Sequence, residues 1–138
     1  MQPSAPLGRR RASGGFTLIE LMVVLALISV LAAMGVAQYR TAVRATKEAV
    51  LAEDLFRMRD AIDQYYADKA KYPESLDALV TDGYLRAIPK DPITNLTDTW
   101  QTVASEPDPS DPTAAIGIVD VKSGAEGTSL DGRPYAEF

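Results

Sequence analysis

The sequence predicts an α+β fold, in which a small antiparallel sheet packs on one long N-terminal helix. An apolar run extends from Phe16 to Ala37, and no proline lies between Pro6 and Pro73. Beyond Pro73, short segments with alternating or β-branched apolar residues are typical of strands. We therefore expect three parts: a leader over residues 1–15, a membrane-spanning helix over 16–37 and a globular domain over 38–138.

The apolar run contains one charged residue, Glu20. A helix over the run would be about 33 Å long, at about 1.5 Å per residue, which is enough to cross the core of a bilayer. A charge near the end of such a helix costs up to a few kcal/mol unless a partner neutralises it. Glu20 therefore requires a specific explanation.

Three simple interpretations of the run compete. An uncleaved signal anchor explains the preceding basic residues, Arg9 to Arg11, but it does not explain Glu20. A cleaved secretory signal needs a small-residue cleavage site, and Leu31–Met34 offers only an approximation inside a run that continues. A buried core helix is disfavoured, because 138 residues cannot cover a helix that is apolar on every face.

The contiguous residues Gly15-Phe16-Thr17-Leu18-Ile19-Glu20 resemble the cleavage and methylation motif of type IV prepilins and type II secretion pseudopilins. The resemblance implies that a prepilin peptidase cuts after Gly15 and that Phe16 becomes the N-methylated N-terminus. The apolar helix would serve first as an anchor and later as the core of a filament. Glu20 lies one turn from the new ammonium group and would neutralise it, or that of a neighbouring subunit, fixing the register.

The helix is expected to continue to about Lys69, because glycine is absent between Gly35 and Gly83. An apolar stripe with helical spacing should face the globular core, and Phe56 and Tyr66 should widen it. The stripe consists of Leu51, Leu55, Met58, Ile62 and Tyr65. Arg40, Arg44 and Lys47 are expected to reach toward lipid phosphates.

A second, short helix is predicted over Pro73–Val80, and strands over Thr99–Val103 and Ile116–Val121. Trp100 should anchor the sheet. Between the strands, the proline-rich and acidic segment 105–113 is predicted to be an exposed loop. Up to residue 92, the order of these segments resembles the major pseudopilin family of type II secretion, protein G, more than a type IV pilin.

The tail, residues 122–132, is rich in glycine and carries spaced oxygen ligands. Calcium takes six to eight oxygens at about 2.3–2.6 Å, many of them backbone carbonyls. The resemblance to major pseudopilins implies a structural calcium ion, to which Ser123, Glu126 and Asp131 would contribute. A plain glycine-rich loop remains the alternative, and no other cofactor is expected.

The amino-acid composition excludes several kinds of functional site and disfavours one class of partner. The chain contains no cysteine and no histidine, which excludes disulfides, Cys or His metal sites and His-dependent catalytic triads. Of the 14 basic side chains three lie in the leader, so the processed chain carries 11 against 19 acidic ones, a formal charge of −8. Nucleic acid is therefore disfavoured as a partner.

The resemblance implies a structural, non-enzymatic protein of the bacterial inner membrane, with one membrane span and its C-terminal domain in the periplasm. It would polymerise with copies of itself into a pseudopilus that drives folded proteins across the outer membrane. Its partners would be membrane lipid, the prepilin peptidase, minor pseudopilins, an inner-membrane assembly platform and the cytoplasmic ATPase of that platform. The alternative is a type IV pilin or minor pilin, with a role in adhesion, twitching motility or DNA uptake.

Overall fold

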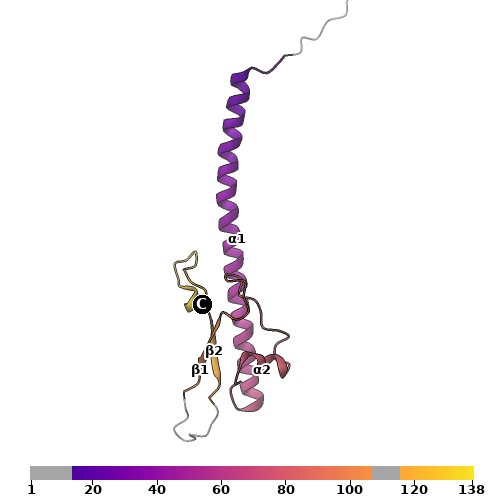
Figure 1. The fold of residues 1–138 in the computed structure, drawn as a ribbon, viewed down its shortest axis with the longest axis vertical. Helices are drawn as coiled ribbons and strands as arrows, with labels where there is room; N and C mark the ends of the chain where they lie inside the picture. Colours follow the sequence, from indigo (N-terminus) through magenta and orange to yellow (C-terminus); the bar gives the residue numbers. More distant parts are fainter. Residues whose placement is uncertain (1–13, 107–115) are drawn as a thin grey trace, which may run out of the picture. The chain divides into compact units, whose positions relative to one another are not determined.

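The computed structural model describes residues 14–106 and 116–138, so most of the predicted leader and of the proline-rich loop lies outside the described residues. The observed helices, the strands and the single-turn 3₁₀ helix η1 are α1 (Leu18–Lys69), α2 (Leu76–Thr81), β1 (Trp100–Ala104), β2 (Ile118–Ser123) and η1 (Tyr135–Glu137). A long helix, a short helix and an antiparallel strand pair confirm the predicted α+β class (Figure 1). The chain divides into two units, Met1–Tyr39 and Arg40–Phe138.

α1 begins at Leu18, two residues later than the apolar run predicted. Thr17 caps it: the Oγ1 of Thr17 accepts a hydrogen bond from the backbone N–H of Glu20 at 3.3 Å, and its carbonyl accepts one from Leu21 at 3.1 Å. Thr17 and Glu20 thus have the Thr-x-x-Glu spacing of a capping box. The predicted C-terminal end of the helix, at Lys69, is confirmed.

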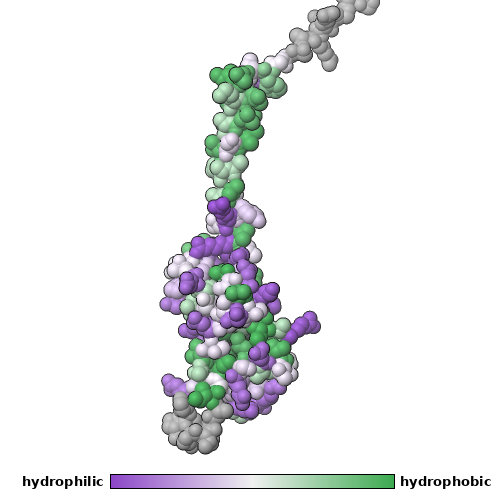
Figure 2. All heavy atoms as spheres, viewed as in Figure 1, coloured by the Kyte–Doolittle hydropathy of each residue, from purple (hydrophilic) through white to green (hydrophobic). Residues whose placement is uncertain are grey.

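The first unit exposes its apolar side chains. Every described residue from Gly14 to Tyr39 is exposed, and the surface of this helical segment is green, the colour of hydrophobic residues, with little purple (Figure 2). By length and composition, α1 contains a segment apolar enough to cross a membrane. This part of the helix therefore carries an apolar surface that the described residues do not cover.

The second unit has a core of its own. The five side chains of the predicted stripe are buried, with exposed fractions of 5% or less, which confirms the stripe. The other elements of the unit contribute apolar side chains to the same cluster: Leu76 and Leu79 from α2, Trp100 from β1, and Ile118 and Val121 from β2. Full burial of one such side chain adds about 1.5–3 kcal/mol to the free energy of unfolding.

Phe56 and Tyr66 do not widen the stripe, and this prediction is wrong. Phe56 is 66% exposed and Tyr66 is 46% exposed. Each follows a buried stripe residue by one position, which rotates its side chain about 100° around the helix, beyond the arc that the core covers. Tyr66 instead stacks on Tyr72, with 4.5 Å between the ring centroids.

α2 begins three residues after the predicted start, because Ser75 caps it. The Oγ of Ser75 accepts a hydrogen bond from the N–H of Ala78 at 3.2 Å. The helix ends at Thr81, and the next turn contains Gly83, whose φ of 83° lies in the left-handed region that glycine adopts easily. The N–H of Tyr84 then donates to the carbonyl of Leu79 at 2.9 Å.

β1 and β2 pair antiparallel, with Trp100 opposite Ser123 and an irregularity between Val103 and Ala104. The strands begin one and two residues later than predicted. Trp100 is 8% exposed and its indole N–H donates to the carbonyl of Pro89 at 2.8 Å. Trp100 therefore anchors the sheet in the core and also fixes the preceding loop.

An ion pair between Lys69 and Asp82 joins the last turn of α1 to the end of α2. The hydrogen bond from Lys69 lowers the pKa of Asp82, and the same bond raises the pKa of Lys69. Lys69 also lies 4.4 Å from the ring centroid of Tyr65, a cation–π contact with the stripe. The C-terminal end of α1 is thus bound to the end of α2 by an ion pair as well as by apolar packing.

Candidate functional site

The predicted processing residues lie just before α1. Gly15 precedes the helix, and a Cβ built on Gly15 meets no other atom within 4 Å. Phe16 is 82% exposed. Among the described residues, the peptide bond between them therefore lies outside regular structure and beside an unobstructed glycine, which suits a peptidase that binds an extended backbone.

Glu20 lies in the first turn of α1. Its carboxylate forms no ion pair with any residue in the described ranges 14–106 and 116–138. The N-terminal end of a helix favours a negative charge, but this effect is worth only about 0.3–1 kcal/mol at an exposed position. In an apolar environment Glu20 would require a cation as well.

The predicted calcium residues have different environments. Ser123 is fully buried; its Oγ donates to Oδ2 of Asp91 at 2.5 Å and accepts from the N–H of Ala125 at 3.1 Å. Glu126 and Asp131 are exposed. Within the part of the chain that the structure describes, no three acidic side chains are gathered as a metal site would need. A calcium ion here would depend on backbone carbonyls and two exposed carboxylates, and calcium binding stays a prediction.

Asp91, which sequence reasoning left inside a proline-bounded loop, is a buried structural carboxylate. Its exposed fraction is 0%, and its Oδ1 accepts hydrogen bonds from the backbone N–H groups of Ile93 at 2.8 Å and Thr94 at 3.3 Å. Its Oδ2 is bound by Ser123 at the end of β2. The sequence signal for this role is the Asp itself, because an Asp side chain often accepts a bond from the backbone N–H two residues on, here that of Ile93, in an Asx turn.

Arg59 connects α1 to the C-terminal part of the chain. Its Nε donates to Oδ1 of Asp120 at 2.7 Å. Its Nη2 donates to the carbonyls of Val121 at 3.0 Å and Phe138 at 2.7 Å. One guanidinium group therefore holds both β2 and the segment after η1 against the helix.

Arg44 and Glu48 hold the tail, and the prediction that Arg44 reaches for lipid is wrong in this structure. Arg44 donates to the carbonyl of Thr128 and lies 3.3 Å from Oε1 of Glu48. Glu48 accepts from the N–H of Leu130 at 3.0 Å and from the hydroxyl of Tyr135 at 2.9 Å. The pKa of Arg44 is raised, chiefly by its hydrogen bond with Tyr135, with Glu48 adding to the rise.

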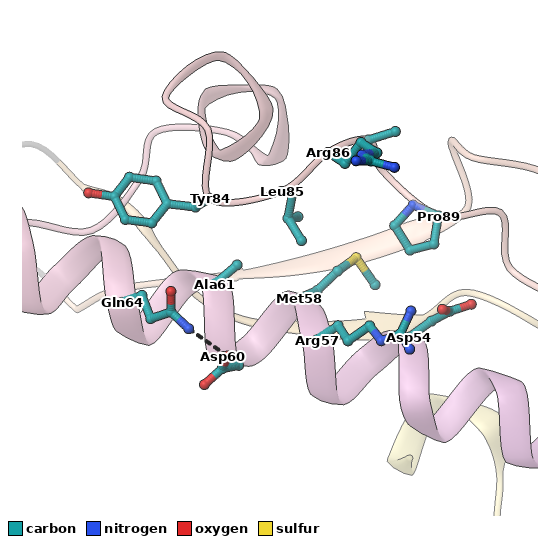
Figure 3. A pocket seen from close by; sticks show the side chains of 11 residues that line it. Asp54, Arg57, Met58, Asp60, Ala61, Gln64, Tyr84, Leu85, Arg86 and Pro89 are labelled. Carbon is teal, nitrogen blue, oxygen red and sulfur yellow. Dashed lines mark hydrogen bonds between the residues drawn. The ribbon is translucent and has the colours of Figure 1, made fainter.

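A cleft of about 330 Å³ lies between α1 and the loop that follows α2 (Figure 3). Acidic Asp54 and basic Arg57 line it from α1, and Arg86 lines it from the loop. Burial raises the pKa of Asp54, and the charge of Arg57 opposes this rise. The described residues that line the cleft include no Ser, Thr, Cys or His. The described lining therefore lacks the Ser–His or Cys–His pair of the common acyl hydrolases.

The prokaryotic N-terminal methylation motif matches residues 10–36, the region that contains Gly15, Phe16 and Glu20. No solved structure matches the chain. The motif match places the predicted processing residues inside a recognised sequence family, in agreement with the interpretation of the apolar run.

Several relatives share one description. Type II secretion system core protein G of Pseudomonas aeruginosa is 36% identical over 100 residues, which cover 61% of this chain and 70% of the relative. The protein of the same description from Vibrio cholerae is 28% identical over 145 residues, covering 89% and 92%. Type IV major pilin protein PilE1 of Neisseria gonorrhoeae is 40% identical, but over 63 residues and 37% of its length. The chain belongs to the type II secretion system core protein G family.

Proposed function

We propose that this chain is the structural subunit of a type II secretion pseudopilus and that it polymerises through the helical segment 16–37. The observation that carries the proposal is the contrast between the two units. The described apolar side chains of the first are exposed, whereas the second buries a complete core. A continuous exposed apolar surface of this kind is typical of segments that contact lipid or neighbouring proteins. The function is assembly, not catalysis.

The subunit first resides in the inner membrane. The basic residues Arg9 to Arg11 precede the apolar segment and favour a cytoplasmic leader, which directs residues 38–138 to the periplasm. A prepilin peptidase then cuts after Gly15 and Phe16 is methylated. Assembly involves minor pseudopilins, an inner-membrane platform and a cytoplasmic ATPase, and the filament acts in moving folded proteins across the outer membrane.

Glu20 is the group that makes assembly specific. Its carboxylate projects from an apolar segment and, among the described residues, has no cationic partner. Cleavage creates one: the ammonium group of Phe16, one helical turn away or on the adjacent subunit. In the apolar filament core an unpaired charge is costly and a paired charge is tolerated. The pair therefore selects one axial register.

Calcium in the tail is a further proposal, supported by the resemblance to major pseudopilins and by the exposed carboxylates of Glu126 and Asp131. Ser123 would contribute through its backbone, because its hydroxyl group is engaged with Asp91. The ion would bind the folded tail only. It would then stabilise the second unit by mass action.

Processing is tested with Gly15→Val. A branched side chain at the cleavage position obstructs an extended backbone in the peptidase, so the full-length precursor should accumulate in membranes. Mass spectrometry of the wild-type protein should show a mature chain that begins with N-methylated Phe16. A mature chain that begins at another residue would contradict the proposal.

Assembly is tested with Glu20→Leu. The more apolar segment should insert into the membrane at least as well as the wild type, but the amount of filament should fall about tenfold or more, because breaking a buried ion pair costs about 3–5 kcal/mol. Filaments are sheared from cells and quantified by immunoblot. Glu53→Leu, an exposed glutamate of the second unit, is the matched control and should assemble normally. Normal filaments from Glu20→Leu would refute the role of the charge.

Calcium binding is tested by melting the mature chain in detergent with calcium and with a chelator. At a hundred times Kd the ion adds about 2.7 kcal/mol, which raises the midpoint by roughly 10 °C or more for a unit of this size. Asp131→Ala should abolish the difference, whereas Asp98→Ala, an exposed aspartate in the segment before β1, should not. Identical melting curves in calcium and in chelator would show that calcium does not stabilise the folded chain.

A further inference from the structure

A short hairpin over residues 127–135 begins within the tail and extends three residues past it. The N–H of Ser129 donates to the carbonyl of Arg133 at 2.8 Å, and the N–H of Tyr135 donates to the carbonyl of Gly127 at 3.2 Å. Thr128 and Pro134 form a bridge of the antiparallel kind between the two sides. Gly127 and Ser129 therefore use their backbone groups inside the hairpin.

The intervening backbone groups form the outer edge of the hairpin. In an extended strand, successive residues direct their N–H and C=O groups to opposite sides. Because Gly127 and Ser129 face the returning strand, the carbonyl of Thr128 faces away from it. Leu130 is the first central residue of the turn Ser129–Gly132, which the N–H of Gly132 closes on the carbonyl of Ser129 at 3.0 Å, and its own N–H also lies outside the hairpin's internal bonds. Such an edge can pair with any other extended chain unless it is covered.

Two side chains of α1 cover this edge. Arg44 donates to the carbonyl of Thr128, and both carboxylate oxygens of Glu48 accept from the N–H of Leu130, at 3.0 and 3.2 Å. The two side chains are four residues apart and lie on the same face of the helix. The hydroxyl of Tyr135 donates to the same carboxylate at 2.9 Å.

We propose that Arg44 and Glu48 together replace a neighbouring β-strand for the tail hairpin. A strand would offer a donor to Thr128 and an acceptor to Leu130, and the helix offers the same pair in the same order. The side chain of Glu48 is only 11% exposed, so its charged hydrogen bonds are partly shielded from water and correspondingly strong. The site therefore recognises the outward-facing backbone groups of Thr128 and Leu130, so its ligand is a segment of its own chain.

This site has two consequences for a subunit that concentrates in a membrane. It closes an edge that would otherwise pair with the tail of another copy. It also fastens the tail to α1 by groups of the chain itself, so that the fastening needs no cation. The assignment goes beyond the proposed function, because a subunit of any filament, or a monomer, would carry it equally.

The test is amide hydrogen exchange at Leu130, measured on the mature full-length chain in detergent with a chelator present. Glu48→Ala should raise the exchange rate of Leu130 about tenfold or more, because a charged hydrogen bond is lost. The amide of Val121 in β2 should keep its protection, which shows that the core remains folded. If the core unfolds in Glu48→Ala, the variant Glu48→Gln is used in its place. One acceptor oxygen then remains, so an intermediate rise in the exchange rate of Leu130 is expected.

Two controls separate backbone recognition from simple charge pairing. Glu53→Ala removes a second ion pair of the same i,i+4 spacing on α1, between the exposed side chains of Arg57 and Glu53 at 2.9 Å, and should leave the exchange of Leu130 unchanged. The double substitution Arg44→Glu with Glu48→Arg preserves an ion pair but reverses donor and acceptor, so Leu130 should exchange as fast as in Glu48→Ala. Unchanged protection in Glu48→Ala, or full protection in the reversed pair, would overturn the proposal. So would a wild-type Leu130 that is unprotected in chelator.

Discussion

The second unit depends on the burial of one face of α1. A two-stranded sheet is marginal by itself, and a helix of six residues is too short to be stable alone. Both become stable because they pack on a continuous stripe that runs from Leu51 to Tyr65. The polar contacts lie along the margins of this stripe: Arg44 and Glu48 toward its N-terminal end, and Arg59 near its middle, each holding a segment that is distant in sequence.

The same helix must satisfy two environments. From Arg40 onward the chain has buried and exposed faces and a core, whereas the described residues before it expose their apolar side chains. A helix satisfies its backbone hydrogen bonds internally, so it can pass from water into lipid, or into a filament core, without changing its secondary structure. Under the proposed processing, only the charge of Glu20 and the ammonium group of Phe16 would then need partners, so the proposal makes assembly sensitive to a single ion pair.

Much of the fold was predictable, because it follows from periodicity. The stripe and the strand pair follow from the spacing of apolar residues on one face of an element, whereas the end of α1 at Lys69 follows from the lack of glycine and proline between Gly35 and Pro73. Periodicity does not say how far around the helix the core extends, so Phe56 was wrongly placed in it. The tail contacts of Arg44 and Glu48 bridge more than 80 positions, and side-chain bonds to distant backbone leave no local signal.

If the apolar segment is covered only by lipid or by neighbouring subunits, a label placed on it should be shielded in an intact filament. The chain has no cysteine, so Ile28→Cys and Thr102→Cys each create a single reactive site. Sheared filaments are treated with a membrane-impermeant maleimide, one sample while intact and a second sample after denaturation. We expect ready labelling at position 102, and at position 28 about a tenth or less of the labelling seen after denaturation. Equal labelling at both positions in intact filaments would contradict it.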